Sequence, residues 1–272
     1  MHPVLTIAKR AALSASRILL RHFDHLERLT VTAKQRSDFV SEADLQAEQE
    51  IIQTLRKTYP NHGILAEESG HQAGQDEYDW IIDPLDGTTN FLHGIPHFAI
   101  SIGFRHKNRL EAGLVFDPIR QELFTASRGG GAQLNDRRIR VSGVAQLDHA
   151  LLGTGFPFRN PRNQPAYLSF FGSLFGQCLE IRRAGAASLD LAYVASGRLD
   201  AFWEMGLSPW DIAAGALLVQ EAGGLVSDFA GGNDFMKSGN IAAGNPKVFK
   251  ALLREMQPHL PVGLAASAET PR

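Results

Sequence analysis

Apolar and polar positions alternate with a helical period at the start of the chain. Apolar side chains recur every three or four residues from Val4 to Phe23, which predicts an amphipathic helix packed on the body of the protein. A second helix is expected to begin at Ser41 and to run to about Tyr59-Pro60, because Ser41 and Asp44 have the spacing of a capping box.

Two short strands are predicted after these helices, and each ends in acidic residues. The strand Gly63–Ala66 is followed by Glu67 and Glu68. The strand Tyr78–Ile82 contains the apolar run Trp80-Ile81-Ile82 and is followed by Asp83. Two consecutive predicted strands are therefore each followed directly by carboxylate side chains.

From Ala99 to Val141 the pattern changes to short strands separated by turns such as Asn135-Asp136. The series predicts an antiparallel sheet that the early helices cover on one face. The expected strands are Ala99–Phe104, Leu110–Phe116, Glu122–Thr125, Ala132–Leu134 and Ile139–Val141.

The second half of the chain resumes the alternation of strands and helices. The expected strands are Ala150–Thr154, Glu180–Arg182, Ala201–Glu204 and Leu225–Ser227, and the expected helices are Ala166–Cys178, Ala187–Ala195, Pro209–Glu221 and Val248–Met256. The change of pattern near residues 142–149 predicts an N-terminal α+β half over 1–145 and a C-terminal α/β half over 146–257. Frequent Pro, Ala and Ser predict a flexible tail over 258–272.

The net charge, the single cysteine and the lengths of the apolar runs argue against several classes of function. A formal net charge of −2 gives no electrostatic reason to expect direct nucleic-acid binding, and an anionic substrate would need a local cation. Cys178 is the only cysteine, which excludes an intramolecular disulfide and a cysteine zinc cluster. The N-terminal segment has no signal-peptide pattern, and no apolar run reaches the ~18 residues of a membrane span. We therefore expect a cytoplasmic enzyme without a membrane partner.

The segment Asp83–Phe91 carries the strongest chemical signal. Mg²⁺ takes oxygen ligands and usually binds one or two carboxylates together with water and phosphate, and Asp83 and Asp86 can supply those carboxylates. Pro84 fixes its own φ and turns the chain, so the carbonyl of Leu85 can also point toward a cation. The segment therefore predicts a magnesium site.

The same segment is suited to an anion. Gly87 lets the backbone approach a ligand closely, and a helix that begins near Thr88 would direct unpaired N–H groups at a phosphate. The alternative is that Asp-Gly forms a simple turn and that Thr and Asn only cap a helix.

A further acid stands at the start of the predicted helix Pro209–Glu221. Pro209 and Asp211 suit a first helical turn, so a plain helix start explains both residues. The alternative is that Asp211 converges with the acids at the strand ends and binds the same metal.

Three segments together resemble the inositol monophosphatase family of magnesium-dependent, lithium-inhibited phosphatases: Glu67-Glu68-Ser69, Asp83–Phe91, and Trp210-Asp211 through Glu221-Ala222-Gly223-Gly224. The resemblance extends over about residues 5–256, and Arg183–Asp190 and Phe202–Gly206 resemble a bacterial branch of the family. It implies an α/β fold, the αβαβα sandwich shared by inositol monophosphatases and fructose bisphosphatases, and a homodimer.

The resemblance also implies roles for individual residues. Two Mg²⁺ ions would be held, one by Glu67, Asp83 and the Leu85 carbonyl, the other by Asp83, Asp86 and Asp211. Glu67 and Thr88 would orient the attacking water, and Asp44 would polarise Thr88 unless it serves only as a helix cap. The substrate contacts would come from Gly87, Thr88, Gly185, Ala187, Glu204 and Asp211.

The implied reaction is hydrolysis of myo-inositol monophosphate by water that two or three metal ions activate, with no covalent enzyme intermediate. Fructose bisphosphate, histidinol phosphate, NADP or a 3′-phosphonucleotide could enter the same site instead. A regulatory protein that binds RNA polymerase or an antitermination complex is an alternative of another class. Ala186 stands where many relatives carry Ser or Thr, which removes one hydroxyl from the site.

Overall fold

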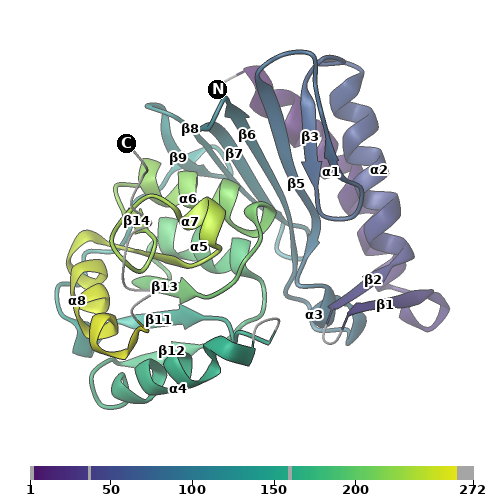
Figure 1. Cartoon of the computed structure of the whole chain (residues 1–272). Helices are drawn as coiled ribbons and strands as arrows, with labels where there is room; N and C mark the ends of the chain where they lie inside the picture. Colours follow the sequence, from purple (N-terminus) through teal and green to yellow (C-terminus); the bar gives the residue numbers. More distant parts are fainter. Residues whose placement is uncertain (1–2, 36–37, 159–160, 262–272) are drawn as a thin grey trace.

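The computed structural model describes residues 3–35, 38–158 and 161–261 of the 272-residue chain. Helical and sheet layers alternate through the molecule (Figure 1). Helices α1 (Pro3–Phe23) and α2 (Glu42–Arg56) cover an eight-stranded sheet. Helices α5 (Ala187–Ala195) and α6 (Pro209–Glu221) separate this sheet from a five-stranded one, and α4 (Gln164–Ser173) and α8 (Pro246–Met256) cover the outer face of the second sheet. This arrangement confirms the αβαβα sandwich that the resemblance implied.

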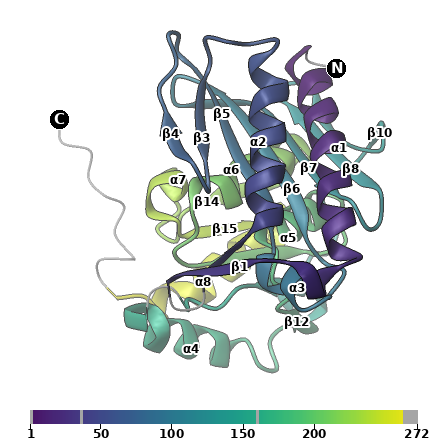
Figure 2. The same ribbon diagram turned by 90° about the vertical axis from the view of Figure 1, so that its right-hand side faces the viewer.

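The outer helices α1 (Pro3–Phe23) and α2 (Glu42–Arg56) lie side by side on one face of the larger sheet (Figure 2). Their buried side chains, Ala12 and Ile51 among them, share one core with that face. The capping box at Ser41 and Asp44 is confirmed. A hairpin of β1 (Val31–Gln35) and β2 (Asp38–Ser41) precedes α2, and the sequence pattern did not predict it.

The larger sheet has the strand order β10-β9-β8-β7-β6-β5-β3-β4, in which only the β3–β5 pair is parallel. Its strands are β3 (Gly63–Ala66), β4 (Gly70–Gln72), β5 (Tyr78–Asp86), β6 (Ala99–His106), β7 (Arg109–Asp117), β8 (Glu122–Ser127), β9 (Gly131–Leu134) and β10 (Arg137–Arg138). The predicted strand Ile139–Val141 is wrong, because the tight turn at Asn135-Asp136 starts the pairing earlier, at Arg137. The Ile139 amide makes one more hydrogen bond to β9, and the Val141 amide already donates to the carbonyl of Ala222.

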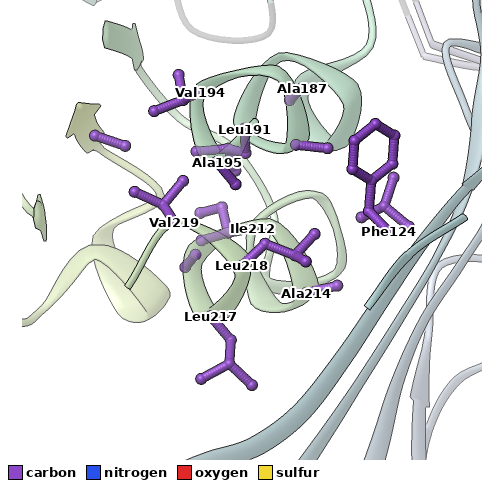
Figure 3. Close-up of a cluster of buried hydrophobic side chains, with 14 of the residues drawn as sticks. Phe124, Ala187, Leu191, Val194, Ala195, Ile212, Ala214, Leu217, Leu218 and Val219 are labelled. Carbon is purple, nitrogen blue, oxygen red and sulfur yellow. The ribbon is translucent and has the colours of Figure 1, made fainter. Parts of the chain in front are cut away.

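The middle layer contains α5 (Ala187–Ala195) and α6 (Pro209–Glu221), which have the predicted bounds. Figure 3 shows side chains of both helices in one buried cluster with Phe124 of β8. Helix α6 approaches the larger sheet so closely that a Cβ atom at Gly113 of β7 would lie 2.9 Å from the Cα of Ala214. Glycine is therefore required where this helix crosses the sheet.

The smaller sheet has the strand order β12-β11-β13-β15-β14. Its strands are β11 (Leu151–Thr154), β12 (Glu180–Arg182), β13 (Ala201–Glu204), β14 (Leu225–Ser227) and β15 (Ile241–Gly244). The remaining helices are α3 (Thr88–Leu92), α4 (Gln164–Ser173), α7 (Phe235–Ser238) and α8 (Pro246–Met256), with short 3₁₀ helices at Leu26–Arg28, Leu147–His149, Pro161–Asn163 and Gln257–His259. Strands β4, β10 and β15 and helix α7 were not predicted, and the helix predicted over Ala166–Cys178 ends at Ser173.

The structure describes only the first residues of the predicted tail over 258–272. Residues 257–259 form the last 3₁₀ helix, and the hydroxyl of Ser169 lies 2.8 Å from Nδ1 of His259. Residues 262–272 lie outside the described residues. Among the helices that the structure describes, none combines the length and the apolar character needed to cross a membrane.

Candidate metal and phosphate site

Acidic residues from three elements converge at one end of the larger sheet. The parallel pair β3 and β5 runs in register from Gly63 and Asp79 to Ala66 and Ile82. The amide of Glu67 continues this pairing by donating to the Ile82 carbonyl at 3.1 Å. The ends of the two strands therefore lie beside each other, as expected for parallel strands, and the N-terminus of α6 brings a third acid to the same place.

Asp83, Asp86 and Asp211 form the centre of the site. One carboxylate oxygen from each lies within 4.8 Å of those of the other two, and all three side chains are buried. Asp83 and Asp86 belong to the last part of β5, where the pairing with β6 is irregular between them. This irregularity allows two acids three positions apart to face one centre.

Hydrogen bonds fix the orientation of each carboxylate in this triad. Oδ1 of Asp83 accepts from the Leu85 amide at 2.9 Å. Oδ2 of Asp86 accepts from both the amide and the hydroxyl of Ser188, at 2.7 and 2.5 Å. Oδ2 of Asp211 accepts from the Ser208 amide at 2.7 Å as part of a capping box. The helix-start interpretation of Asp211 and its convergence with the other acids therefore both hold.

The three buried carboxyl groups of the triad repel one another when they are ionised, so a bound cation would stabilise them. Burial, with the charges of Glu67, Asp86 and Asp211, raises the pKa of Asp83 well above its usual range. Burial and the charge of Asp211 raise the pKa of Asp86 to about 7. Buried like charges are costly unless a counter-charge compensates them, and clustered carboxylate oxygens are the ligands that Mg²⁺ prefers. The donor set therefore fits magnesium.

Thr88 lies directly after this centre, at the first position of α3. Its hydroxyl is 3.0 Å from the Leu85 carbonyl oxygen and 3.3 Å from Oδ1 of Asp44. Oδ2 of Asp44 meanwhile accepts from the amide and hydroxyl of Ser41, which completes the cap of α2. Asp44 thus both caps a helix and contacts Thr88.

Gly87 and Asn90 shape the turn that carries Thr88. Gly87 has a φ of 94°, a left-handed conformation that favours glycine, and the predicted helix start after it is confirmed. The side-chain amide of Asn90 donates to the His97 carbonyl at 2.8 Å and to the Ala184 carbonyl at 2.9 Å. Asn90 therefore connects this turn to the segment that precedes α5.

A cavity of about 150 Å³ opens above these residues. Every residue that the sequence analysis proposed as a metal ligand or substrate contact lines this cavity: Glu67, Asp83, Leu85, Asp86, Gly87, Thr88, Gly185, Ala187, Glu204 and Asp211. Asp44 does not line it and contacts Thr88 instead. Ala186 is not among the lining residues, and it occupies the N-cap position of α5 with its side chain buried. The hydroxyl that this chain lacks would therefore stand in a helix cap.

Some residues of the site were not predicted from the sequence. Glu48 accepts from the amides of Glu68 and Ser69 and so holds the loop that carries Glu67. Ser188, which is 102 positions away from Asp86 in the sequence, orients the Asp86 carboxylate through its amide. Asp190 lines the cavity, and the only hint of it in the sequence was an acid inside an otherwise apolar helix.

Comparisons with known proteins agree with this geometry. The family model described as the inositol monophosphatase family matches residues 1–260. A Pseudomonas aeruginosa protein named Nus factor SuhB is 60% identical over 269 residues, which cover 97% of this chain and 99% of that protein. A crystal structure of the extragenic suppressor protein suhB from Bartonella henselae is 45% identical, with a TM-score of 0.92 and coverage of 94% and 99% of the two chains. The inositol monophosphatase from Anabaena is 38% identical, with a TM-score of 0.83 and coverage of 96% and 97%.

Proposed function

The chain belongs to the inositol monophosphatase family, which is a phosphatase family, and on this premise we propose that it hydrolyses myo-inositol monophosphate with the help of Mg²⁺. The observation that carries the proposal is the buried triad of Asp83, Asp86 and Asp211 at the wall of a cavity that Thr88 also lines. Hydrolysis of a phosphate monoester depends on charge stabilisation and positioning far more than on covalent chemistry.

The proposed metal ligands follow from the donor atoms around the triad. Glu67, Asp83 and the carbonyl of Leu85 are proposed for one Mg²⁺, and Asp83, Asp86 and Asp211 for another. When bound, these ions would neutralise charge on the phosphate and the leaving oxygen and make a water molecule more acidic. The three aspartates are oriented by hydrogen bonds before any ion binds, which lowers the entropic cost of assembling the site.

Thr88 and Glu67 are proposed to orient the attacking water. A hydroxyl has one proton to donate, and the proton of Thr88 is directed at Asp44 or at the Leu85 carbonyl. The lone pairs of its oxygen are therefore available to accept a hydrogen bond from water, and Glu67 takes the proton that the water loses. The water oxygen bonds to phosphorus as the ester P–O bond breaks, and the leaving oxygen keeps the electron pair of that bond and takes a proton from solvent to give the free alcohol. No covalent enzyme intermediate forms.

Substrate contacts are proposed for residues that line the cavity around the triad. The backbone of Gly87 and Thr88, at the start of α3, faces the phosphate. Gly185, Ala187, Glu204 and Asp211 also line the cavity and would contact the polyol. Glu204 is a partly buried carboxylate there, which suits hydroxyl groups as hydrogen-bond donors.

Release of inorganic phosphate from a panel of esters tests this function. The panel comprises myo-inositol 1-phosphate, fructose 1,6-bisphosphate, histidinol phosphate, 3′-phosphoadenosine 5′-phosphate and NADP, each with Mg²⁺, with EDTA and with added Li⁺. We expect preferential, Mg²⁺-dependent and Li⁺-sensitive hydrolysis of the inositol ester. Preference for another ester would retain the site and replace the substrate, whereas no turnover of any ester by folded protein would overturn the proposal.

A second function is favoured by the relative named Nus factor SuhB, which is 60% identical to this chain. We propose that the protein also binds RNA polymerase or an antitermination complex, a role that would require a cytoplasmic location. Capture from native lysate with the wild-type protein and with Asp83→Asn tests it. Recovery of RNA polymerase subunits by both proteins would support an association that is independent of catalysis, and recovery by neither would contradict it.

A homodimer is proposed on the basis of an exposed apolar surface around α4. Phe158, Leu168, Phe175 and Leu179 lie in or near α4 in the sequence and expose between 53% and 71% of their area, and exposed apolar surface can mark a protein interface. Light scattering on the purified protein tests the proposal. A mass of one chain at micromolar concentration would contradict it.

A further inference from the structure

Two carboxylates lie in the cavity apart from the metal triad. Asp190 of α5 and Glu204 at the end of β13 both line the cavity, and Asp190 is 2% exposed. Neither belongs to the group of Asp83, Asp86 and Asp211 whose oxygens lie within 4.8 Å of one another. Their charges are therefore not explained by the proposed metal centre.

Two glycines of one strand edge lie beside this pair. A Cβ atom at Gly155 would lie 2.0 Å from Cδ of Glu204, so this carboxyl group needs glycine there. A Cβ atom at Gly153 would first meet Leu199 and Phe202, and it would lie in ordinary contact, at 3.6 Å, with Cγ of Asp190. Gly153 and Gly155 are two positions apart, so their missing side chains would point to the same face of β11 and its extension. The carboxyl groups of Asp190 and Glu204 occupy that face side by side.

The carboxyl group of Asp190 has no hydrogen-bond donor in the described part of the chain. The charged groups that act on it are Asp86, which repels the ionised form, and Arg183, which attracts it. Arg183 is also the only cationic side chain among the described residues that line the cavity, and its guanidinium lies 5.4 Å from the centre of the Phe156 ring. The fully buried unpaired side-chain atoms among the described residues belong to His97, Trp203 and Trp210 and not to Asp190, so the Asp190 oxygens open onto the cavity. Hydroxyl groups of a ligand in the cavity can therefore donate hydrogen bonds to them.

We propose that Asp190 is a specificity-determining residue that, together with Glu204, accepts hydrogen bonds from hydroxyl groups of the substrate and so selects phosphate esters of polyols. The inference rests on the proposed phosphatase function. It extends that function by one residue outside the metal centre. It also states which chemical feature of the substrate the cavity recognises, namely several hydroxyl groups near the ester.

The test compares two esters and two variants. Steady-state kcat/KM is measured for myo-inositol 1-phosphate and for phenyl phosphate, which has no hydroxyl group, with wild type and Asp190→Asn. We expect the variant to lower kcat/KM for the inositol ester about 10- to 100-fold, the range for loss of a hydrogen bond to a charged group, while the value for phenyl phosphate stays within about 3-fold.

Asp228→Asn is the matched control. Asp228 is also a buried aspartate, but it accepts from the amides of Ala230, Gly232 and Asp234 and does not line the cavity. Its loss should lower thermal stability and leave the ratio of the two kcat/KM values unchanged. Asp190→Ser replaces Asp190→Asn in the comparison if thermal melting shows that the latter does not fold.

The outcomes separate the inference from the function on which it rests. An equal fall for both esters, or no change for either, with an active wild type would overturn the role of Asp190 alone. A folded wild type that hydrolyses neither ester would overturn the phosphatase function and the inference with it. A selective fall for the inositol ester supports both.

Discussion

The hydroxyl of Thr88 lies 3.3 Å from Oδ1 of Asp44, a residue whose other carboxylate oxygen caps helix α2. A helix in the outer layer is thereby connected to the hydroxyl that faces the metal and phosphate site. Asp44 and the Leu85 carbonyl, at 3.0 Å, are both acceptors for the Thr88 proton, and donation to either leaves the hydroxyl oxygen to accept a hydrogen bond from water.

Removing that hydroxyl should impair turnover more than binding. Thr88→Val keeps the shape of the side chain, so we expect kcat to fall about 100-fold or more, the lower range for a group that positions a proton transfer, with a small change in KM. Steady-state kinetics with myo-inositol 1-phosphate and thermal melting check this. Turnover within about 2-fold of wild type would contradict the role of Thr88.

The stability gained from Mg²⁺ should grow with pH. Burial and Asp211 raise the pKa of Asp86 from 3.8 to about 7, so the folded chain retains a proton there that the unfolded chain has released. The metal-free protein therefore loses stability as pH rises from about 4 to about 7. Because Mg²⁺ would compensate the ionised acids, the difference in Tm between Mg²⁺ and EDTA should increase from pH 5 to pH 8. A difference that does not change with pH would count against this account.

Gly155→Ala should act on substrate selection through Glu204. The added Cβ atom would lie 2.0 Å from the Glu204 carboxyl carbon, so this side chain must move. We expect a loss of about 1–3 kcal/mol in the free energy of unfolding from overpacking, and a lower kcat/KM for the inositol ester relative to phenyl phosphate. Gly143→Ala is the control, because nothing lies within 4 Å of a Cβ atom there. The same substrate ratio in both variants would contradict the prediction.

Gly113→Ala should disturb the metal site from a distance. The new Cβ atom would lie 2.9 Å from both the Cα and the carbonyl oxygen of Ala214, so α6 must shift away from the sheet. Since α6 carries Asp211, we expect weaker Mg²⁺ binding, seen as a higher Mg²⁺ concentration for half-maximal activity, together with lower stability. Gly172→Ala, at a helical position with open space, should leave both properties unimpaired.

Much of the fold and of the metal centre could be predicted because the signals are local. A capping box at Ser41, a short apolar strand before Asp83 and Pro209 at a helix start each depend on a few adjacent residues. The two predicted strands each lead into acidic residues, so these acids were expected to converge. The parallel pairing of β3 and β5 explains why they do.

The rest depends on contacts between distant parts of the chain. Strand β15 lies between β13 and β14, and its short apolar segment Ile241–Gly244 has no pattern of its own. The place of Asp190 depends on the packing of α5 against β11 and β13, and periodicity does not reveal which helical acid faces a cavity. The bond between Ser188 and Asp86 likewise exists only in the folded chain.

The central claim is that Asp83 belongs to a metal centre that hydrolyses a phosphate ester. The most direct measurement is phosphate release from myo-inositol 1-phosphate as a function of Mg²⁺ concentration for wild type and Asp83→Asn, with circular dichroism to verify folding. The account predicts Mg²⁺-dependent turnover by the wild type and a loss of about 10³-fold or more in the variant even at saturating Mg²⁺, because a charge central to the site is removed. Near-normal turnover by folded Asp83→Asn would contradict it.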